Sequence, residues 1–167
     1  MNLIVLKSKI DNGLKWILVF IMATMTLNVL WQVFSRFVLQ NPSSFTEELA
    51  RYLLIWIGLL GASYVAGQRL HLAIDLLSTK LEGKSKIYLD LFIQSMILLF
   101  SVIVMVIGGV RLVYITLSLN QITAALQIPL GYVYTVLPIS GLLIVYYTVN
   151  FIIEAFNELK SIESADK

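Results

Sequence analysis

Uncharged apolar segments separated by short polar stretches make up most of the chain. Runs without a charged residue cover residues 16–35, 52–68 and 91–110, and no charged residue occurs between Leu112 and Ile153. Polar residues and Pro129 divide this last run into a loop and a fourth apolar segment over residues 129–153. Because roughly 20 apolar residues cross the hydrocarbon core of a bilayer, the pattern predicts four transmembrane segments.

The four segments are predicted to be helices, because backbone groups in lipid find partners only in helices and closed barrels, and four segments are too few for a barrel. We expect helices over about residues 14–39, 45–68, 87–119 and 129–156, forming one membrane domain over residues 1–167. Pro129 suits a first helical turn, where its missing N–H would have no partner in any case. The third helix, about 50 Å long, must tilt or project beyond the bilayer.

The stretch between the second and third helices has its own periodicity. Leu70, Ile74, Leu77 and Leu81 recur at helical spacing among polar residues. This pattern favours a short amphipathic helix lying in the membrane interface, with an ordinary loop as the alternative. The predicted fold class is therefore an all-α integral membrane protein with four transmembrane helices and a short interfacial helix between the second and third.

Composition supports a membrane protein and excludes several functions. Hydrophobic residues make up 59% of the 167 residues and charged residues only 13%, and the mean hydropathy is +0.87. A soluble domain carries about a quarter charged residues, so membrane lipid is the expected surrounding. A net charge of only +2 implies no nucleic-acid partner.

Residues that carry chemistry are scarce. The chain has no cysteine and a single histidine, His71, which excludes thiolate catalysis and leaves no second histidine to share a metal. An integral-membrane enzyme would need a cluster of nucleophile, base or metal ligands at one depth. We therefore expect no catalytic, cofactor-binding or metal-binding residue in this chain.

The positive charges predict the orientation. Nine of the twelve Lys and Arg residues lie before the first helix, between the second and third, or after the fourth, whereas Arg36, Arg51 and Arg111 lie on the other side. Positive residues concentrate on the cytoplasmic side, so both termini are expected there. The first apolar segment is longer than a signal-peptide core and no small-residue cleavage site follows it, so we interpret it as an uncleaved helix.

Two helix faces are candidates for packing. Polar residues line one side of the first helix at four-residue spacing: Thr24, Asn28, Gln32 and Arg36. They are expected to hydrogen-bond to other helices, and the alternative is a substrate-binding stripe. The second helix carries Gly58-x-x-x-Ala62-x-x-x-Ala66, a small-residue face that would let another helix approach closely.

Charged residues gather around the first hairpin. They are Arg36, Glu47, Glu48 and Arg51. Both glutamates lie within one helical turn of Arg51, so the cluster is expected to staple the hairpin, with contact to a partner subunit as the alternative. Ser44-x-x-Glu47 is typical of a capping box at the start of the second helix.

A longer motif surrounds this hairpin. It runs from Arg36 to Trp56 with Asn41-Pro42-Ser43-Ser44-Phe45-Thr46-Glu47-Glu48 in its centre, and continues with Gly61-Ala62 and with His71-Leu72-Ala73-Ile74-Asp75-Leu76-Leu77. These residues resemble the small membrane subunit of tripartite ATP-independent periplasmic (TRAP) transporters, the DctQ-like family. Chain length and helix number agree with that resemblance.

The resemblance implies an accessory role in the bacterial inner (cytoplasmic) membrane. The expected partners are a large multi-helix membrane subunit and a periplasmic substrate-binding protein, and the expected process is sodium-coupled uptake of a dicarboxylate or a sugar acid such as sialic acid. Sodium and substrate sites would lie on the large subunit. The alternative is a self-sufficient small exporter, which would need an embedded carboxylate in the first helix, where the sequence has none.

Overall fold

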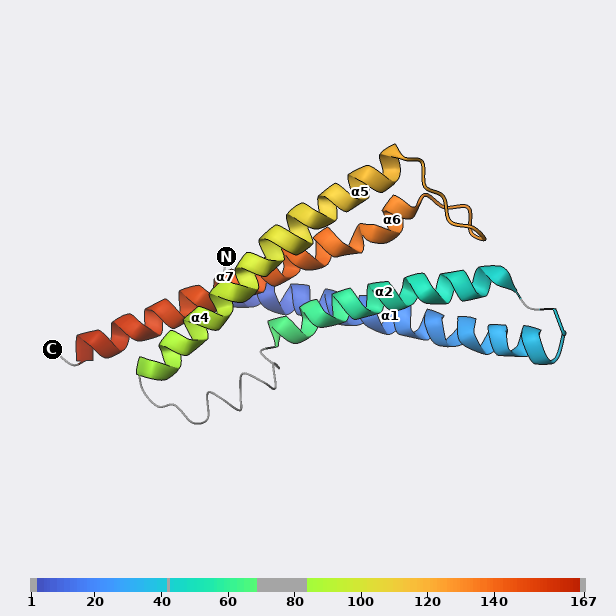
Figure 1. Cartoon of the computed structure of the whole chain (residues 1–167). Coiled ribbons are helices and arrows are strands. Elements are labelled where there is room, and N and C mark those ends of the chain that lie inside the picture. Colours follow the sequence, from blue (N-terminus) through green and yellow to red (C-terminus); the bar gives the residue numbers. More distant parts are fainter. Residues whose placement is uncertain (1–2, 42, 69–83, 166–167) are drawn as a thin grey trace.

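The computed structural model describes residues 3–41, 43–68 and 84–165. In this part of the chain the elements, shown in Figure 1, are α1 (Leu3–Phe37), α2 (Ser44–Gly67), α4 (Lys84–Phe100), the π-helical segment η1 (Ser101–Gly108), α5 (Gly109–Ser118), α6 (Leu130–Tyr134) and α7 (Val136–Ala165). The interfacial helix predicted around residues 70–81 lies outside the described residues, as does His71.

The fold class predicted for the four spans is confirmed. Four helical stretches are long and apolar enough to cross a membrane: Val5–Phe37, Ser44–Gly67, Ser85–Ser118 and Leu130–Ser161. The described residues form no β-strand beyond an isolated bridge between Ile122 and Pro129. The protein is therefore an all-α, multi-pass membrane protein.

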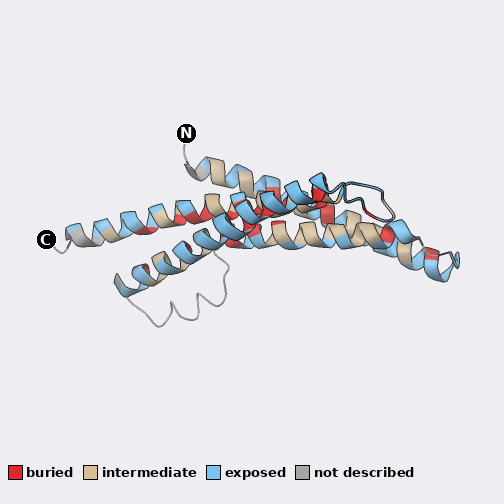
Figure 2. Ribbon diagram, turned by 45° about the horizontal axis from the view of Figure 1, so that its top comes forward, coloured by how far each residue is buried: buried red, intermediate tan, exposed pale blue. Residues whose placement is uncertain are grey.

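The helices form two hairpins that share one seam. α1 packs against α2, α7 packs against α4 and η1, and α2 joins the hairpins by packing along α7. We call the end with residues 38–41 and 119–129 the loop end, and the opposite end, where α1 begins and α7 ends, the terminal end (Figure 1). Buried residues concentrate along α7 and where the other helices cross it (Figure 2), so α7 is the central helix.

Two helices extend further than the apolar runs suggest. α1 begins at Leu3 rather than near residue 14, and α7 ends at Ala165 rather than near residue 156. The charge-free runs mark where lipid begins, but Lys and Glu are good helix formers, so the helices continue into the polar turns. The predicted helix over residues 87–119 is α4, η1 and α5 in succession.

Proline interrupts the fourth span. Pro129 precedes α6 as its N-cap, and a break at Thr135 separates α6 from α7. Pro138 has no N–H for the carbonyl of Tyr134, four residues earlier, so a regular helix cannot continue there. The i→i−4 hydrogen-bonding pattern of a helix resumes one residue later, where the Ile139 N–H donates to the Thr135 carbonyl at 3.2 Å.

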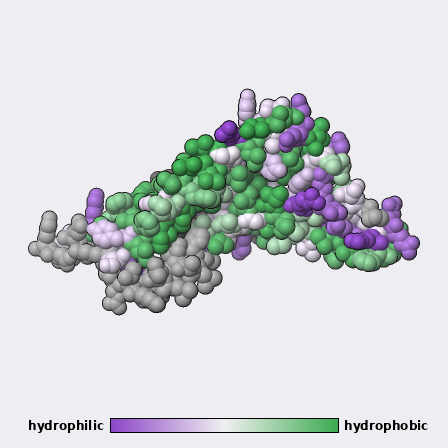
Figure 3. All heavy atoms as spheres, viewed as in Figure 1, coloured by the Kyte–Doolittle hydropathy of each residue, from purple (hydrophilic) through white to green (hydrophobic). Residues whose placement is uncertain are grey.

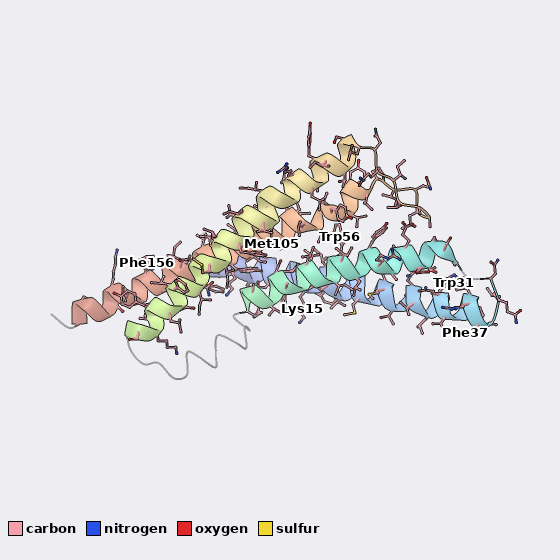
Figure 4. All side chains as sticks on the ribbon, viewed as in Figure 1. Lys15, Trp31, Phe37, Trp56, Met105 and Phe156 are labelled. Carbon is pink, nitrogen blue, oxygen red and sulfur yellow. The ribbon has the colours of Figure 1, made fainter. Side chains whose placement is uncertain are left out.

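Glycines permit close crossings of α7 with η1 and α5. A Cβ added at Gly141 would lie 2.7 Å from the Cβ of Met105, and one at Gly109 would lie 2.9 Å from the Cδ of Pro138. These contacts are shorter than real Cβ atoms make, so the helices can approach this closely only while both positions lack a side chain. Figure 4 labels Met105 at this crossing.

We expect Gly141→Ala to lower the free energy of unfolding by about 1–3 kcal/mol, because the added methyl group overpacks the α7–η1 crossing. Gly58→Ala is the matched control, since nothing lies within 4 Å of a Cβ at Gly58 and Ala is the better helix former by roughly 0.5–1 kcal/mol. Thermal unfolding in mild detergent, followed by circular dichroism, measures both. An unchanged midpoint for Gly141→Ala would contradict the close crossing.

Candidate functional site at the seam and the loop end

The seam between α2 and the α6–α7 arm consists of side chains of α2 bound to backbone groups of the other hairpin. The Trp56 indole donates to the Val133 carbonyl at 3.1 Å, and the Ser63 hydroxyl donates to the Ser140 carbonyl at 3.1 Å. Each pair is separated by 77 residues. Because the offset is constant, α2 and the α6–α7 arm run in the same direction and in register.

Glu48 lies where this seam reaches the loop end of the molecule. Its carboxylate accepts hydrogen bonds from three consecutive backbone N–H groups, those of Ala124 (3.0 Å), Ala125 (2.7 Å) and Leu126 (2.8 Å). The Tyr52 hydroxyl donates to the same carboxylate at 2.8 Å. Hydrogen bonds to an ionised acceptor are among the strongest in proteins, so a single side chain fixes the position of the loop between α5 and α6.

The loop itself is uncharged and sharply turned. Residues 119–129 contain no charged side chain, and Asn120 and Gln127 adopt positive φ angles of 48° and 55°. The Thr123 hydroxyl accepts from the Ile128 N–H at 3.0 Å, and the Leu130 N–H donates to the Gln121 carbonyl at 2.8 Å. These internal bonds leave the N–H groups of residues 124–126 directed at Glu48.

The predicted charged cluster is divided in the structure. Glu47 and Arg51 form an exposed ion pair at 3.7 Å, with 68% of each side chain accessible. Glu48 points instead to the loop, because successive helix positions are turned by about 100°. Arg36 lies 6.0 Å from the ring of its neighbour Phe37, and within the described residues it forms no ion pair with either glutamate. Figure 3 shows hydrophilic residues gathered at this loop end and an apolar surface over the middle of the molecule.

The first turn of α2 is held differently from the predicted capping box. Ser43, not Ser44, is the N-cap, and its side chain makes no cap hydrogen bond. The Thr46 hydroxyl donates to the Ser43 carbonyl, and the Asn28 amide of α1 donates to the Thr46 carbonyl, both at 2.7 Å. The capping-box prediction was wrong, because the N-cap lies one residue earlier than the box requires and Glu47 pairs with Arg51 instead of reaching back to the helix start.

The other packing candidates lie in different surroundings. Gln32 is half-buried, and the Thr24 hydroxyl donates to the Phe20 carbonyl of its own helix. Gly58 and Ala62 are exposed, whereas Ala66 is buried with Met105 and Ile144. α7 approaches α2 beside this face, at Ser63 and Gly67.

A second cluster, absent from the sequence-based candidates, joins three helices at the terminal end. Asp11 of α1 accepts hydrogen bonds from the Tyr147 hydroxyl of α7 at 2.5 Å and from the amide of Gln68, just after α2, at 3.1 Å. Tyr147 is 1% exposed, and its ring lies 2.7 Å from the place of a Cβ on Gly67. Asp11 is the only acidic residue before Glu47, which is the one sequence signal that could have marked it.

This arrangement defines a class of protein. Glu48, Trp56 and Ser63 of the seam bind the chain's own backbone, and within the described residues no three His, Cys, Asp or Glu side chains are grouped to hold a metal ion. The structure is that of a multi-pass helical membrane subunit, with clusters that fix its helices at both ends.

Comparison with known proteins identifies the family. Residues 25–158 match the family described as tripartite ATP-independent periplasmic transporters, DctQ component, and the chain belongs to this family. A putative TRAP transporter small permease protein of Haemophilus influenzae is 29% identical over 135 residues, which are 81% of this chain and 82% of the relative. The sialic acid TRAP transporter small permease protein SiaQ of Vibrio cholerae is 29% identical over 142 residues, with the same coverage of both chains.

A third relative is much longer. The sialic acid TRAP transporter permease protein SiaT of Haemophilus influenzae is 32% identical over 66 residues, which are 40% of this chain and only 11% of the relative. The resemblance drawn from the sequence is thus confirmed, and the chain is a small permease subunit of a TRAP transporter rather than an enzyme.

We expect Glu48→Gln to loosen the loop end, because the amide of glutamine cannot accept from three N–H groups and lacks the negative charge. Hydrogen exchange measured by mass spectrometry should become several-fold faster at residues 124–126. Glu47→Gln is the matched control, because it removes a charge from an exposed pair and exposed pairs contribute little. Equal exchange in the two variants would contradict the role of Glu48.

We expect Tyr147→Phe to lower the free energy of unfolding by about 1.5–3 kcal/mol, the usual contribution of a hydrogen bond to a charged group. Tyr146→Phe is the matched control, since the Tyr146 hydroxyl is buried and has no hydrogen-bond partner in the described part of the chain. Both variants keep the neighbouring ring contact between the two residues. Chemical unfolding in mild detergent distinguishes them, and equal losses would rule out the bond to Asp11.

Proposed function

We propose that this chain is the accessory subunit that supports a large permease subunit during sodium-coupled uptake of an organic anion across the bacterial inner membrane. The observation that carries the proposal is membership of the DctQ family. The SiaT match adds support, because a segment similar to part of this chain occurs within a permease about nine times longer than the matched segment. The presence of both segments in one protein favours a stable side-by-side association of this chain with a large permease subunit in the membrane.

The hydrogen bonds made by the polar side chains support an accessory role for this chain, with the transport sites on the large subunit. Glu48, Trp56, Ser63 and Asp11 are occupied in holding helices together. We therefore assign the sodium and substrate sites to the large subunit. The SiaQ relative, named for sialic acid, supports a sugar acid as the solute, with a dicarboxylate as the related possibility, delivered by a periplasmic binding protein.

One side of α2 is the proposed contact for the large subunit. Glu47, Arg51, Gly58 and Ala62 recur at intervals of four or seven residues and are exposed, so they share a side of the helix. Transmembrane helices associate through small residues, whereas the exposed positions of α1 carry bulky side chains such as Trp16, 72% exposed, that suit lipid. Figure 4 labels Trp31 and Phe37, two more aromatic residues of α1.

Reconstitution tests the function. In liposomes with a sodium gradient, the chain alone should transport no sialic acid or dicarboxylate, and adding the large subunit and the loaded binding protein should give sodium-dependent uptake. Transport by the isolated chain would instead favour the self-sufficient exporter. In the same system Gly58→Leu should reduce recovery of the large subunit, while Lys160→Ala, a change at an exposed position near the end of α7, should not.

The proposed orientation has the terminal end in the cytoplasm. Lys7, Lys9, Lys86 and Lys160 lie on the helix turns of that end, and Arg36 lies at the loop end, as the positive-inside rule requires. The chain has no native cysteine, so single Ser118→Cys and Ser164→Cys variants can be labelled with an impermeant thiol reagent. Ser118→Cys should react only from the periplasm and Ser164→Cys only from the cytoplasm, and the reverse would overturn the orientation.

A further inference from the structure

Both spans of the second hairpin are irregular at the same level. The π-helical segment η1 (Ser101–Gly108) separates α4 from α5, and the other span is broken at Thr135, close to Pro138. The two irregularities face each other, because a Cβ added at Gly109 would lie 2.9 Å from the Cδ of Pro138. Prolines and π-helical turns are common causes of sharp bends in helices, so both helices of this hairpin can bend at one level.

The first residue of η1 has an unused hydrogen-bond donor. Ser101 is 1% exposed, and its hydroxyl has no partner among the residues that the structure describes. The hydroxyls of Ser63 and Ser95, in contrast, donate to the carbonyls four residues earlier in their own helices. An α-helical turn would offer Ser101 the Ile97 carbonyl in the same way. A second, α-helical state of η1 would therefore satisfy a donor that the π-helical state leaves unpaired.

The part of the hairpin beyond this level is internally bonded. We call it the outer arm, and it consists of α5, α6 and the loop between them. Gly131 of α6 lies close to α5, since a Cβ there would be 2.5 Å from the Cγ of Leu117. The Gln121 N–H donates to the Thr116 carbonyl at 3.1 Å, and the Leu130 N–H donates to the Gln121 carbonyl at 2.8 Å. These contacts tie the loop to both helices, so the outer arm would move as one unit.

The bonds from α2 lie at different distances from the irregular level. Trp56 binds a carbonyl two residues from the break in the fourth span, and Ser63 binds one on the α7 side of that break. Glu48 instead binds residues 124–126 at the far end of the outer arm, where the loop bends towards the start of α2 (Figure 1). A bend at the irregular level would thus release Glu48 while the bonds of Trp56 and Ser63 stay in place.

We propose that the second hairpin is hinged at η1 and the break at Thr135, and that the Glu48 carboxylate holds the outer arm in the position next to α2. When Glu48 releases the loop, η1 returns to α-helical bonding and the outer arm pivots away from α2, while α4 and α7 keep their places. The released loop lies at an aqueous end of the molecule, so water can bind its N–H groups. A bend of about 20° would move Ser118, about 14 Å from Gly109 along α5, by about 5 Å.

Distances between pairs of spin labels test the hinge, because the full chain has no native cysteine. Labelled cysteines at Leu54 of α2 and Ser118 of α5 report on the outer arm, and Leu54 with Phe92 of α4 is the reference pair; all three positions are exposed. In lipid nanodiscs, double electron–electron resonance of the wild type should give one narrow distance for each pair. Glu48→Gln should add a population about 5 Å longer for the Ser118 pair only. Glu47→Gln is the matched control and should add none.

Two further changes, made together with Glu48→Gln, distinguish a hinge from a loosened loop. Pro138→Ala supplies the missing N–H and should leave one population in place of two, because a continuous helix removes one of the two bends. Ser101→Ala should lower the longer population several-fold, since it removes the hydrogen bond that the α-helical state would gain. Ser95→Ala is its matched control and should leave both populations unchanged.

Three results would overturn the hinge. They are an unchanged distance for the Ser118 pair in Glu48→Gln, an equal shift of the reference pair, and a longer population that neither Pro138→Ala nor Ser101→Ala alters. Circular dichroism checks the folding of each variant. Ser101→Ala changes a single buried hydroxyl, so it keeps the test decisive if Pro138→Ala does not fold.

Discussion

The interaction on which the rest of the structure depends is the binding of α2 side chains to backbone groups of the other hairpin. Inside a bilayer no water is present to satisfy a backbone group that its own helix leaves unpaired. The fourth span has such groups, because Pro138 and the break at Thr135 interrupt its helical bonding. Trp56 binds a carbonyl beside this break, and Glu48 binds three N–H groups of the loop before it. Side chains of the regular helix α2 thus supply hydrogen-bond partners to the irregular backbone before and within the fourth span.

This seam also explains which positions must be small. Ser63 and Ser140 are fully buried where α2 meets α7, and Gly67 leaves room for the ring of Tyr147. A larger side chain at Ser63, Ser140 or Gly67 would separate α2 from α7. The hydrogen bonds that Trp56 and Ser63 donate across this seam would then lengthen. Close packing and hydrogen bonding therefore constrain the same few residues. The clusters of Glu48 and Asp11 fix the seam at its two ends, so the hairpins cannot slide past each other without breaking charge-assisted bonds.

The sequence was sufficient for the number of spans and the fold class, because transfer of an apolar run into lipid depends on local composition. It was insufficient for the partners of Glu48, since backbone N–H groups in an uncharged loop leave no signal in the sequence. A charge-based interpretation therefore placed both glutamates in one cluster with Arg51, whereas in the described residues only Glu47 pairs with Arg51 and Glu48 binds the loop. Tyr147 was missed for a similar reason: its partner Asp11 is 136 residues away. Helix ends were misplaced because hydropathy marks the membrane boundary, and the helices continue past it.

The two outer sides of the first hairpin differ in a way that bears on assembly. α1 exposes bulky and aromatic side chains, whereas α2 exposes Gly58 and Ala62. Lipid tails conform to an uneven bulky surface, but a rigid helix can come close only where side chains are small. The same hairpin can therefore separate lipid on one side from a protein partner on the other. Because the seam holds this hairpin firmly on α7, force applied at the α2 side would be carried by the whole four-helix unit, which suits the proposed role as a support for a large permease subunit.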